Sequence, residues 1–313
     1  MTDGPTEPGI LSFIERYRAL APDAVWDAPA AEQRAVYDRV SAHFRAPRPP
    51  KLRVEEMALT LPGRALPLRI YQPPGDVQRP AVVYLHGGGF ILGGLESHDD
   101  VCAEIAMAAD VAVLAVDYRL SPEHPYPAAL EDGLAALEYL RRTDQRIDST
   151  RILLAGDSAG GCLAAAMTHA LAAGAGPQVQ GQILIYPTLG GDRTKGSYIE
   201  NADAPLCTRT STDGYWRAYS PAKPDPDDPC FRPLSLDNAR DVPATFIVAC
   251  QHDPLRDDAE AYAEKLRSAN VPVTLRLESE LVHGYLRARA MSPAAAESFR
   301  AICQAIEEMS RAP

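Results

Sequence analysis

The sequence is poor in features that mark several large protein classes. Its 313 residues carry 31 basic side chains against 42 acidic ones, a formal net charge of −11. A broad basic surface for nucleic acid is therefore not expected. No apolar run approaches the length of about 18 residues that a transmembrane helix needs, so no membrane span is predicted. The N-terminus has neither a basic start nor an early apolar stretch, so we expect no signal peptide and a cytoplasmic protein.

Cysteine is also sparse. The six cysteines form no C-x-x-C pair, and most stand in apolar segments. We expect free, buried thiols in a reducing compartment, without disulfides, a metal or a cofactor. Hydrophobic residues still make up 46% of the chain, which excludes global disorder and allows a large core. The 28 prolines outnumber the 21 glycines and indicate long, shaped loops around a regular core.

Short apolar runs alternate with segments of helical periodicity along most of the chain. The predicted strands are 54–59, 67–71, 81–85, 111–116, 151–155, 182–186, 245–250 and 273–277. The predicted helices are 10–19, 30–44, 99–109, 128–141, 158–173, 257–269 and 293–309. The first two strands read as a hairpin around Pro62-Gly63. This alternation is typical of an α/β protein with a mostly parallel eight-stranded sheet covered on both faces.

Two segments lie outside this regular alternation. Residues 1–50 end in the proline-rich linker RAPRPP (45–50) and precede a larger unit, 51–313. The 58 residues from Pro187 to Ala244 separate the sixth and seventh strands and contain an amphipathic piece with Tyr215 and Trp216. Connections of this length in a compact domain are usually functional. The organisation predicted is one main domain with an N-terminal helical segment and an insert around 187–230.

The strongest local motif is Gly156-Asp157-Ser158-Ala159-Gly160, a G-x-S-x-G pattern between a predicted strand and a predicted helix. In that context the serine sits on a sharp turn and its hydroxyl points away from the sheet edge. Ser158 is therefore a candidate nucleophile. The alternative is that Ser158 only caps the following helix.

A second motif, His86-Gly87-Gly88-Gly89-Phe90, follows the third predicted strand. Consecutive glycines allow the main chain to approach a substrate closely, and their N–H groups can stabilise an oxyanion. Gly88, Gly89 and Ala159 are the expected donors. A phosphate-binding loop is the alternative, but the Gly-Lys-[Ser/Thr] ending is missing.

A serine nucleophile needs a base, and the base needs an orienting carboxylate. Of the seven histidines, His283 is the best base because it follows the last predicted strand, and catalytic groups gather at the carboxyl ends of such strands. Asp253 follows the seventh strand and is preferred as the acid over Asp257, whose simpler role is to begin a helix. The resulting order Ser158, Asp253, His283 is the α/β-hydrolase order.

These motifs together resemble the bacterial hormone-sensitive-lipase family of carboxylesterases. The matching pieces are HGGGF (86–90), DYRLSPEHPYPAALED (117–132), GDSAGG (156–161), DPLRD (253–257) and HGY (283–285). HGGGFILGGLESHD (86–99) and QHDPLRDDA (251–259) are similar to the acetyl esterase branch. The resemblance implies an α/β-hydrolase fold, a cap formed by residues 1–50 and the insert, and the roles already given to Ser158, Asp253 and His283.

The same resemblance implies roles for further residues. His86 and Gly87 are expected to brace the glycine loop, and Glu123 matches an acidic position that supports the serine turn. Candidate pocket walls are Phe90, Tyr215, Trp216 and Leu286. For Tyr215 and Trp216 the alternative is that they only anchor the cap to the body of the protein.

The expected activity is hydrolysis of small esters with acyl groups from acetyl to roughly hexanoyl, through an acyl-enzyme and without a metal or cofactor. A serine amidase or peptidase on the same fold is the first alternative. A non-catalytic small-molecule binding protein is the second, and the presence of His283 argues against it. The expected partner is a small-molecule ester. The sequence does not decide between a monomer and a homodimer.

Overall fold

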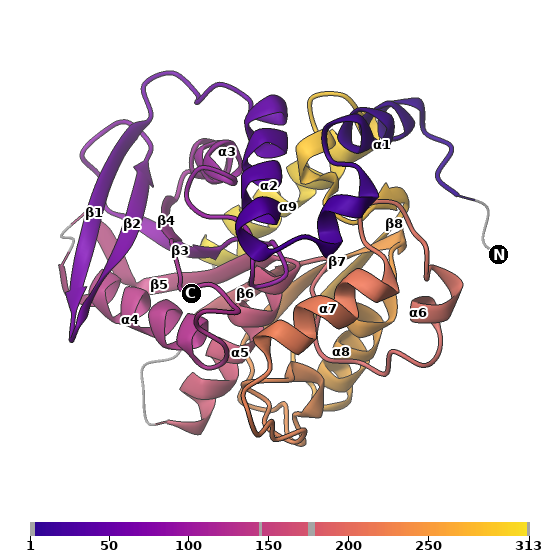
Figure 1. The fold of residues 1–313 in the computed structure, drawn as a ribbon. Coiled ribbons are helices and arrows are strands. Elements are labelled where there is room, and N and C mark those ends of the chain that lie inside the picture. Colours follow the sequence, from indigo (N-terminus) through magenta and orange to yellow (C-terminus); the bar gives the residue numbers. More distant parts are fainter. Residues whose placement is uncertain (1–3, 144–145, 175–178, 312–313) are drawn as a thin grey trace.

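A single eight-stranded sheet runs through the protein, in a computed structural model that describes residues 4–143, 146–174 and 179–311 (Figure 1). The strands are β1 (Arg53–Leu61), β2 (Arg64–Gln72), β3 (Arg79–Leu85), β4 (Ala112–Val116), β5 (Ile147–Asp157), β6 (Gly181–Ile185), β7 (Ala244–His252) and β8 (Val273–Val282). Their order is β1-β2-β4-β3-β5-β6-β7-β8. β2 pairs antiparallel with β1 and β4, and every other pair is parallel. The expected mostly parallel eight-stranded sheet is confirmed.

Helices cover both faces of this sheet. They are α1 (Pro8–Leu20), α2 (Ala30–Phe44), α3 (Asp99–Ala109), α4 (Ala128–Thr143), α5 (Ala159–Ala173), α6 (Ser197–Glu200), α7 (Arg209–Tyr219), α8 (Arg256–Ser268) and α9 (Pro293–Arg311). Three short 3₁₀ helices are also present: η1 (Asp23–Asp27), η2 (Pro233–Ser235) and η3 (Tyr285–Ala288). The one-turn helix α6 and the 3₁₀ helices were not expected, because such short pieces carry no readable periodicity.

The core divides into two layers, one on each face of the sheet. Along β3, Ala81, Val83 and Leu85 face one layer, and Val82 and Tyr84 face the other. Side chains of α4, α5 and α8 fill the first layer, whereas those of α1, α2, α3 and α9 fill the second. Central strands buried on both faces explain why the sequence shows continuous apolar runs there instead of alternation.

The parallel strands fix where the motifs meet. The glycine motif follows β3, the serine follows β5, Asp253 follows β7 and His283 follows β8. Because parallel strands point the same way, their carboxyl ends lie at one edge of the sheet, and the four motifs are brought together there.

The linker and the insert contribute little to the sheet itself. Residues 45–49 form no helix or strand, and Arg48 in this linker pairs with the buried Asp99 at 2.8 Å. The insert contains α6 and α7, and η2 follows it before β7. Across the described residues, no helix has the length and apolar character needed to cross a membrane.

Candidate active site

Ser158 stands on a strained turn between β5 and α5. Its φ and ψ are 54° and −117°, a region that a residue with a Cβ rarely adopts and that costs of the order of 1–3 kcal/mol. The backbone N–H of Ser158 donates to the carbonyl of Ile185 at 2.8 Å, which fixes the turn against β6. The Ser158 side chain makes no capping hydrogen bond to α5. The capping alternative is therefore excluded in this geometry, and the hydroxyl is free for another partner.

The glycines on either side of Ser158 are required by close packing. A Cβ at Gly160 would collide with the carbonyl oxygen of Leu85 in β3. A Cβ at Gly156 would collide with the backbone of Gly160 across the turn. The G-x-S-x-G pattern thus reflects two points where the main chain passes too close to another main chain for any side chain.

His283 connects Ser158 to Asp253. Its Nε2 lies 2.8 Å from Ser158 Oγ, and its Nδ1 lies 2.7 Å from Asp253 Oδ2. Asp253 is almost fully buried, and its other carboxylate oxygen accepts the N–H of Leu255 at 2.9 Å. One imidazole therefore lies between a hydroxyl and a fixed carboxylate, as the sequence predicted for these three residues.

Asp257, the alternative acid, has different partners. Its carboxylate accepts the backbone N–H of Ser197 at 2.9 Å and pairs with the Arg256 guanidinium at 2.9 Å. It ties α6 to the start of α8, and neither of these partners is His283. The choice of Asp253 agrees with this geometry.

The glycine motif presents unoccupied donors beside Ser158. Gly88 and Gly89 have φ values of 128° and 61°, which only glycine adopts readily. Within the described residues, the backbone N–H groups of Gly88, Gly89 and Ala159 have no hydrogen-bond acceptor. Donors left free at the edge of a cavity are suited to an oxygen that gains negative charge.

Replacing Gly88 with alanine is expected to lower kcat by about 100-fold or more, because one preorganised donor is displaced. The new Cβ would collide with the carbonyl oxygen of Leu92, and the φ of 128° is strained for alanine. Steady-state kinetics on a small ester measures the effect.

Gly214→Ala is the matched control for this change. Gly214 lies in α7 at the same cavity, and nothing stands within 4 Å of an added Cβ. We expect Gly214→Ala to retain kcat within about threefold and to gain up to about 1 kcal/mol of stability from helix propensity. Equal losses in both variants would show that the effect at Gly88 is not specific to the loop.

His86 braces the glycine loop and is not positioned as an acid or base. Its Nδ1 lies 2.9 Å from the carbonyl oxygen of Gly87, and its ring stacks on Tyr118 with centroids 4.2 Å apart. Burial lowers the pKa of His86 to about 3, so the ring is neutral at physiological pH. The supporting position expected for His86 and Gly87 agrees with these contacts.

Asp157 has a larger part in the site than the sequence indicated. Its buried carboxylate accepts Tyr84 Oη at 2.9 Å, the N–H of Gly87 at 3.0 Å, His98 Nε2 at 3.3 Å and Tyr186 Oη at 3.4 Å. Burial raises the pKa of this carboxyl, but the electrostatic interaction with His98 and these hydrogen bonds outweigh it and hold the pKa below its usual range. Asp157 therefore fixes the glycine loop to the serine turn as an ionised carboxylate. The available sequence signal was an acid inside a buried segment, which requires partners.

Glu123 does not support the serine turn as expected. Its carboxylate pairs with Arg34 of α2 at 2.6 Å, and about half of its side chain, 53%, is exposed. The Arg34 guanidinium lowers the pKa of Glu123 to about 2. Arg34 also donates to the carbonyl oxygens of Ile91 and Ser121, each at 2.8 Å. Glu123 thus helps to hold α2 against the loops after β3 and β4.

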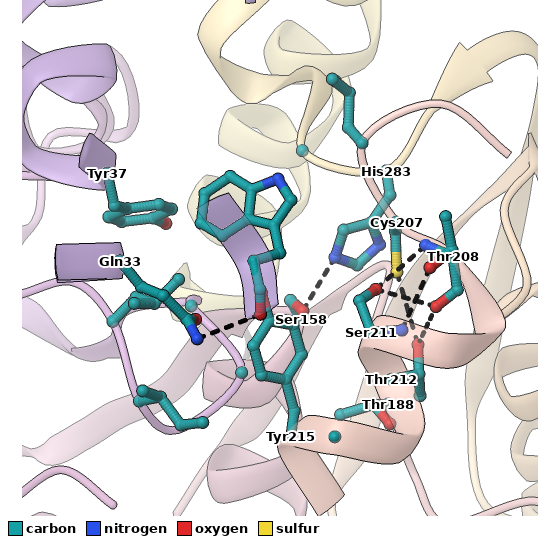
Figure 2. Close-up of a pocket in the computed structure, with 18 of the residues that line it drawn as sticks. Gln33, Tyr37, Ser158, Thr188, Cys207, Thr208, Ser211, Thr212, Tyr215 and His283 are labelled. Carbon is teal, nitrogen blue, oxygen red and sulfur yellow. Dashed lines mark hydrogen bonds between the residues drawn. The ribbon is translucent and has the colours of Figure 1, made fainter. Parts of the chain in front are cut away.

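The cavity above Ser158 has a volume of about 890 Å³ and is lined by residues from distant parts of the chain. Figure 2 shows Gln33 and Tyr37 of α2 on one side of Ser158, and Cys207 with the residues at the start of α7 on the other. Tyr215 of α7 points toward Ser158, and its ring covers Gly89. Segments far apart in the sequence therefore enclose one space around the hydroxyl.

Three of the four expected pocket residues line this cavity: Phe90, Tyr215 and Trp216. Phe90 also stacks on Tyr219 with centroids 3.7 Å apart, and Trp216 Nε1 donates to Thr188 Oγ1 at 2.9 Å. Phe90 and Trp216 therefore line the cavity and also hold the segments around it together. Leu286 is the exception: it is 1% exposed and packs in the core layer with α9, so its expected place in the pocket is wrong. The one-turn η3 directs it inward.

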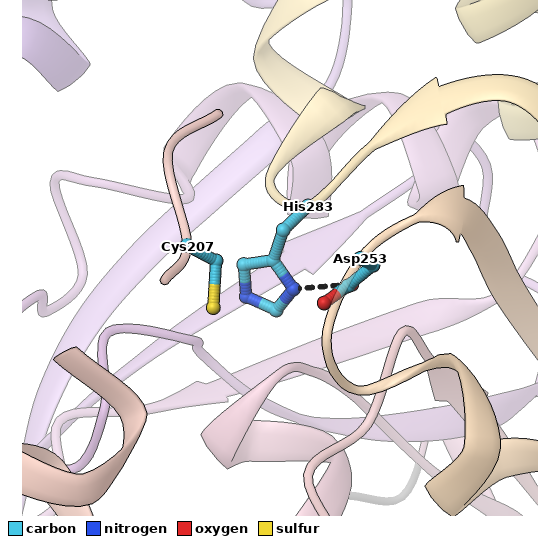
Figure 3. Close-up of side chains that lie close together, drawn as sticks. All are labelled: Cys207, Asp253 and His283. Carbon is cyan, nitrogen blue, oxygen red and sulfur yellow. Dashed lines mark hydrogen bonds and ion pairs between the residues drawn. The ribbon is translucent and has the colours of Figure 1, made fainter. Parts of the chain in front are cut away.

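Cys207 lies beside His283, although no sequence motif pointed to it. The thiol, an Asp253 oxygen and a His283 nitrogen all lie within 4.8 Å of one another (Figure 3). Burial raises the pKa of the Cys207 thiol well above its usual range. A protonated thiol is a poor metal ligand, and Asp253 and His283 are already bonded to each other, so these residues suit proton transfer better than metal binding.

The fold and this site define the class: an α/β protein with a Ser–His–Asp arrangement at the carboxyl ends of its strands. The chain matches the family model for the alpha/beta hydrolase fold over residues 82–287. It is 43% identical over 257 residues to carboxylesterase NlhH of Mycobacterium tuberculosis, covering 80% of each chain. It is 32% identical over 264 residues to an ethyl acetate hydrolase of Pseudomonas putida, covering 82% of each.

A solved structure agrees with these relatives. A hyperthermophilic esterase from the archaeon Pyrobaculum calidifontis matches with a TM-score of 0.91 and 30% identity, over 98% of this chain and 100% of that one. The chain therefore belongs to the α/β-hydrolase family, among its hormone-sensitive-lipase-like carboxylesterases, and is a carboxylic ester hydrolase.

Proposed function

We propose that this enzyme hydrolyses small esters of short acyl groups, from acetyl to about hexanoyl, with Ser158 as nucleophile, His283 as base and Asp253 as acid. The observation that carries the proposal is the unbroken chain of hydrogen bonds from Ser158 Oγ through His283 to Asp253, at 2.8 and 2.7 Å. The strained turn at Ser158 and the free N–H groups beside it support the same assignment.

In the first half of the reaction, Ser158 Oγ attacks the acyl carbon while its proton moves to His283 Nε2. Asp253 holds Nδ1–H and stabilises the imidazolium that forms. The oxyanion accepts hydrogen bonds from Gly88, Gly89 and Ala159, each donor contributing of the order of 3 kcal/mol. His283 then protonates the leaving alcohol, and the acyl group stays on Ser158.

In the second half, water replaces the alcohol. His283 removes a proton from the water as it attacks the acyl carbon, and the same N–H groups hold the second oxyanion. Collapse of that intermediate returns the proton to Ser158 and releases the carboxylic acid. In the proposed cycle, Ser158, His283, Asp253 and the N–H donors act on the ester and on one water molecule.

We further propose that residues 1–50 and the insert around 187–230 form a cap on the catalytic unit, 51–313. The cavity is lined by Tyr17, Gln33 and Tyr37 from the N-terminal helices and by Tyr215 and Trp216 from the insert. Those five side chains share the cavity with Ser158 and His283, which follow strand ends, and this supports a cover over the site.

The acyl-length preference rests on the acetyl-esterase-like motifs and on the relative described as an ethyl acetate hydrolase. A series of p-nitrophenyl esters from acetate to palmitate tests it. We expect kcat/KM to be highest at an acyl length of about two to six carbons and to fall at least tenfold by about twelve. A maximum at long chains would contradict the proposed preference.

The same assay separates the ester hydrolase from the amidase alternative. We expect p-nitroacetanilide to be cleaved at least about 100-fold less efficiently than p-nitrophenyl acetate, because the amine is a poorer leaving group. Comparable rates on the two compounds would favour an amidase.

A further inference from the structure

Arg287 places a positive charge at the wall of the cavity. It lies in η3, four positions after His283, and lines the same space as Ser158 and Tyr37. Its guanidinium carbon is 4.8 Å from the centre of the Tyr37 ring, and Nη2 donates to Ser41 Oγ at 3.0 Å. These contacts orient the guanidinium between η3 and α2.

The Arg287 charge has no carboxylate partner in the described part of the chain. Among the described residues, none of the acidic side chains lies within 4.0 Å of its guanidinium. Within the described chain its Nε is buried without a hydrogen-bond partner, and the polar side chains that its guanidinium meets, Ser41 and Tyr37, are both uncharged. Arg289, two residues later, shows the contrast: it pairs with Asp100 at 2.6 Å and Glu104 at 2.8 Å. A cation withdrawn from water is costly unless it is paired.

The groups around Arg287 do not remove this imbalance. Asp157 is the carboxylate that its charge influences most directly, but the oxygens of Asp157 already accept four hydrogen bonds from other residues. Burial raises the pKa values of Tyr17, Tyr37 and Tyr186, so these phenols are neutral.

The remaining charges of the cavity lie at its rim. Asp213 is paired with Arg193 at 2.7 Å. The other rim charges are exposed and of both signs: Arg18, Asp27, Asp203 and Arg217. Arg287 is thus the unpaired cation of the inner wall, in the part of the chain that the structure describes.

We propose that Arg287 binds a carboxylate carried by the ester substrate, so that the enzyme prefers esters of acidic compounds to neutral esters of the same size. A guanidinium offers several donors in one plane and binds carboxylates in a directed manner. The inference rests on the proposed function, since it concerns the substrate of Ser158. The carboxylate belongs either to the acyl part or to the alcohol part of the ester, and two substrate pairs distinguish these sources.

The first pair is ethyl hydrogen succinate and ethyl 4-methylpentanoate, in which two methyl groups replace the carboxylate oxygens of the acyl part. The second pair is acetoxyacetate and isobutyl acetate, which differ in the same way on the alcohol part. We expect the wild-type enzyme to hydrolyse one of the acidic esters with a kcat/KM at least about tenfold above that of its neutral isostere. This comparison needs no variant, so it stands even if a substitution impairs folding.

Variants then assign the preference to Arg287. Arg287→Met is expected to lower kcat/KM for the favoured acidic ester at least about tenfold, mainly by raising KM. Its kcat/KM for the neutral isostere should change by less than about threefold. Arg287→Lys should recover part of the loss because it keeps the charge. Arg217→Met, at the exposed rim of the same cavity, is the matched control and should leave the ratio between the two esters unchanged.

Several results would overturn the proposal. One is a wild-type enzyme with equal kcat/KM for the acidic and the neutral ester in both pairs. Another is an Arg287→Met variant whose kcat/KM falls equally for both esters of a pair. The second result would mean that Arg287 serves only to hold α2 against η3. Failure of the proposed function looks different: no ester of either pair would be turned over by the wild-type enzyme.

Discussion

Ser158→Ala is expected to lower kcat/KM for a small ester by at least about 10⁴-fold while the protein stays folded. Residues of a Ser–His–Asp group act as a unit, and removal of the nucleophile costs of the order of 10⁴–10⁶-fold in hydrolases of this type. The hydroxyl makes one side-chain hydrogen bond, to His283, and does not cap α5. Its removal should therefore leave the melting temperature within about 3 °C.

Ser235→Ala is the matched control for the nucleophile. Ser235 lies in η2 and does not line the cavity, and its buried hydroxyl has no hydrogen-bond partner among the described residues. We expect wild-type kinetics from this variant. Substantial esterase activity in Ser158→Ala, with contamination excluded by purification from two independent preparations, would remove Ser158 from the nucleophile role.

Asp253→Asn is expected to lower kcat by about 10³–10⁴-fold with a small change in KM. The Asp253 carboxylate accepts Nδ1–H of His283 at 2.7 Å and so leaves Nε2 unprotonated toward Ser158. An asparagine amide can instead donate to Nδ1, which moves the proton of the neutral ring to Nε2, where it blocks transfer from Ser158. Stopped-flow or steady-state kinetics on p-nitrophenyl acetate measures the loss.

The sequence offers a control at the rejected position. Asp257→Asn removes a carboxylate that contacts Ser197 and Arg256, and not His283. We expect its kcat to stay within about threefold of wild type, with a loss of stability of about 1 kcal/mol from the weakened contacts. If the two variants exchanged these effects, Asp257 would be the acid.

The motifs were readable from the sequence because each is a local feature with its own physical cause. The glycines around Ser158 mark points of close main-chain approach, and His283 and Asp253 each follow an apolar run that forms a strand. Given a parallel sheet, the position of each motif after its strand is enough to place all of them at one edge. Strand order did not need to be known for this inference.

The residues that the sequence did not indicate are those whose role depends on contacts across the fold. Asp157 joins β3, β5 and β6 through partners up to 73 positions away. Arg287 is unusual only because no carboxylate among the residues that the structure describes pairs with it, and a sequence does not show such an absence. Leu286 was misplaced because, in the one-turn helix η3, the side chain that lines the cavity is that of Arg287, one position later. Glu123 was misplaced because its partner, Arg34, lies 89 positions earlier.

Covalent labelling of the nucleophile provides the most direct test of the proposed site. The wild-type enzyme is incubated with a fluorophosphonate, digested, and mapped by tandem mass spectrometry, with Ser158→Ala and Asp253→Asn treated in parallel. We expect one adduct per chain, on Ser158, absent from Ser158→Ala and formed much more slowly in Asp253→Asn. No adduct in an enzyme that still hydrolyses esters, or an adduct on another residue that accounts for the loss of activity, would contradict the assignment of Ser158, His283 and Asp253.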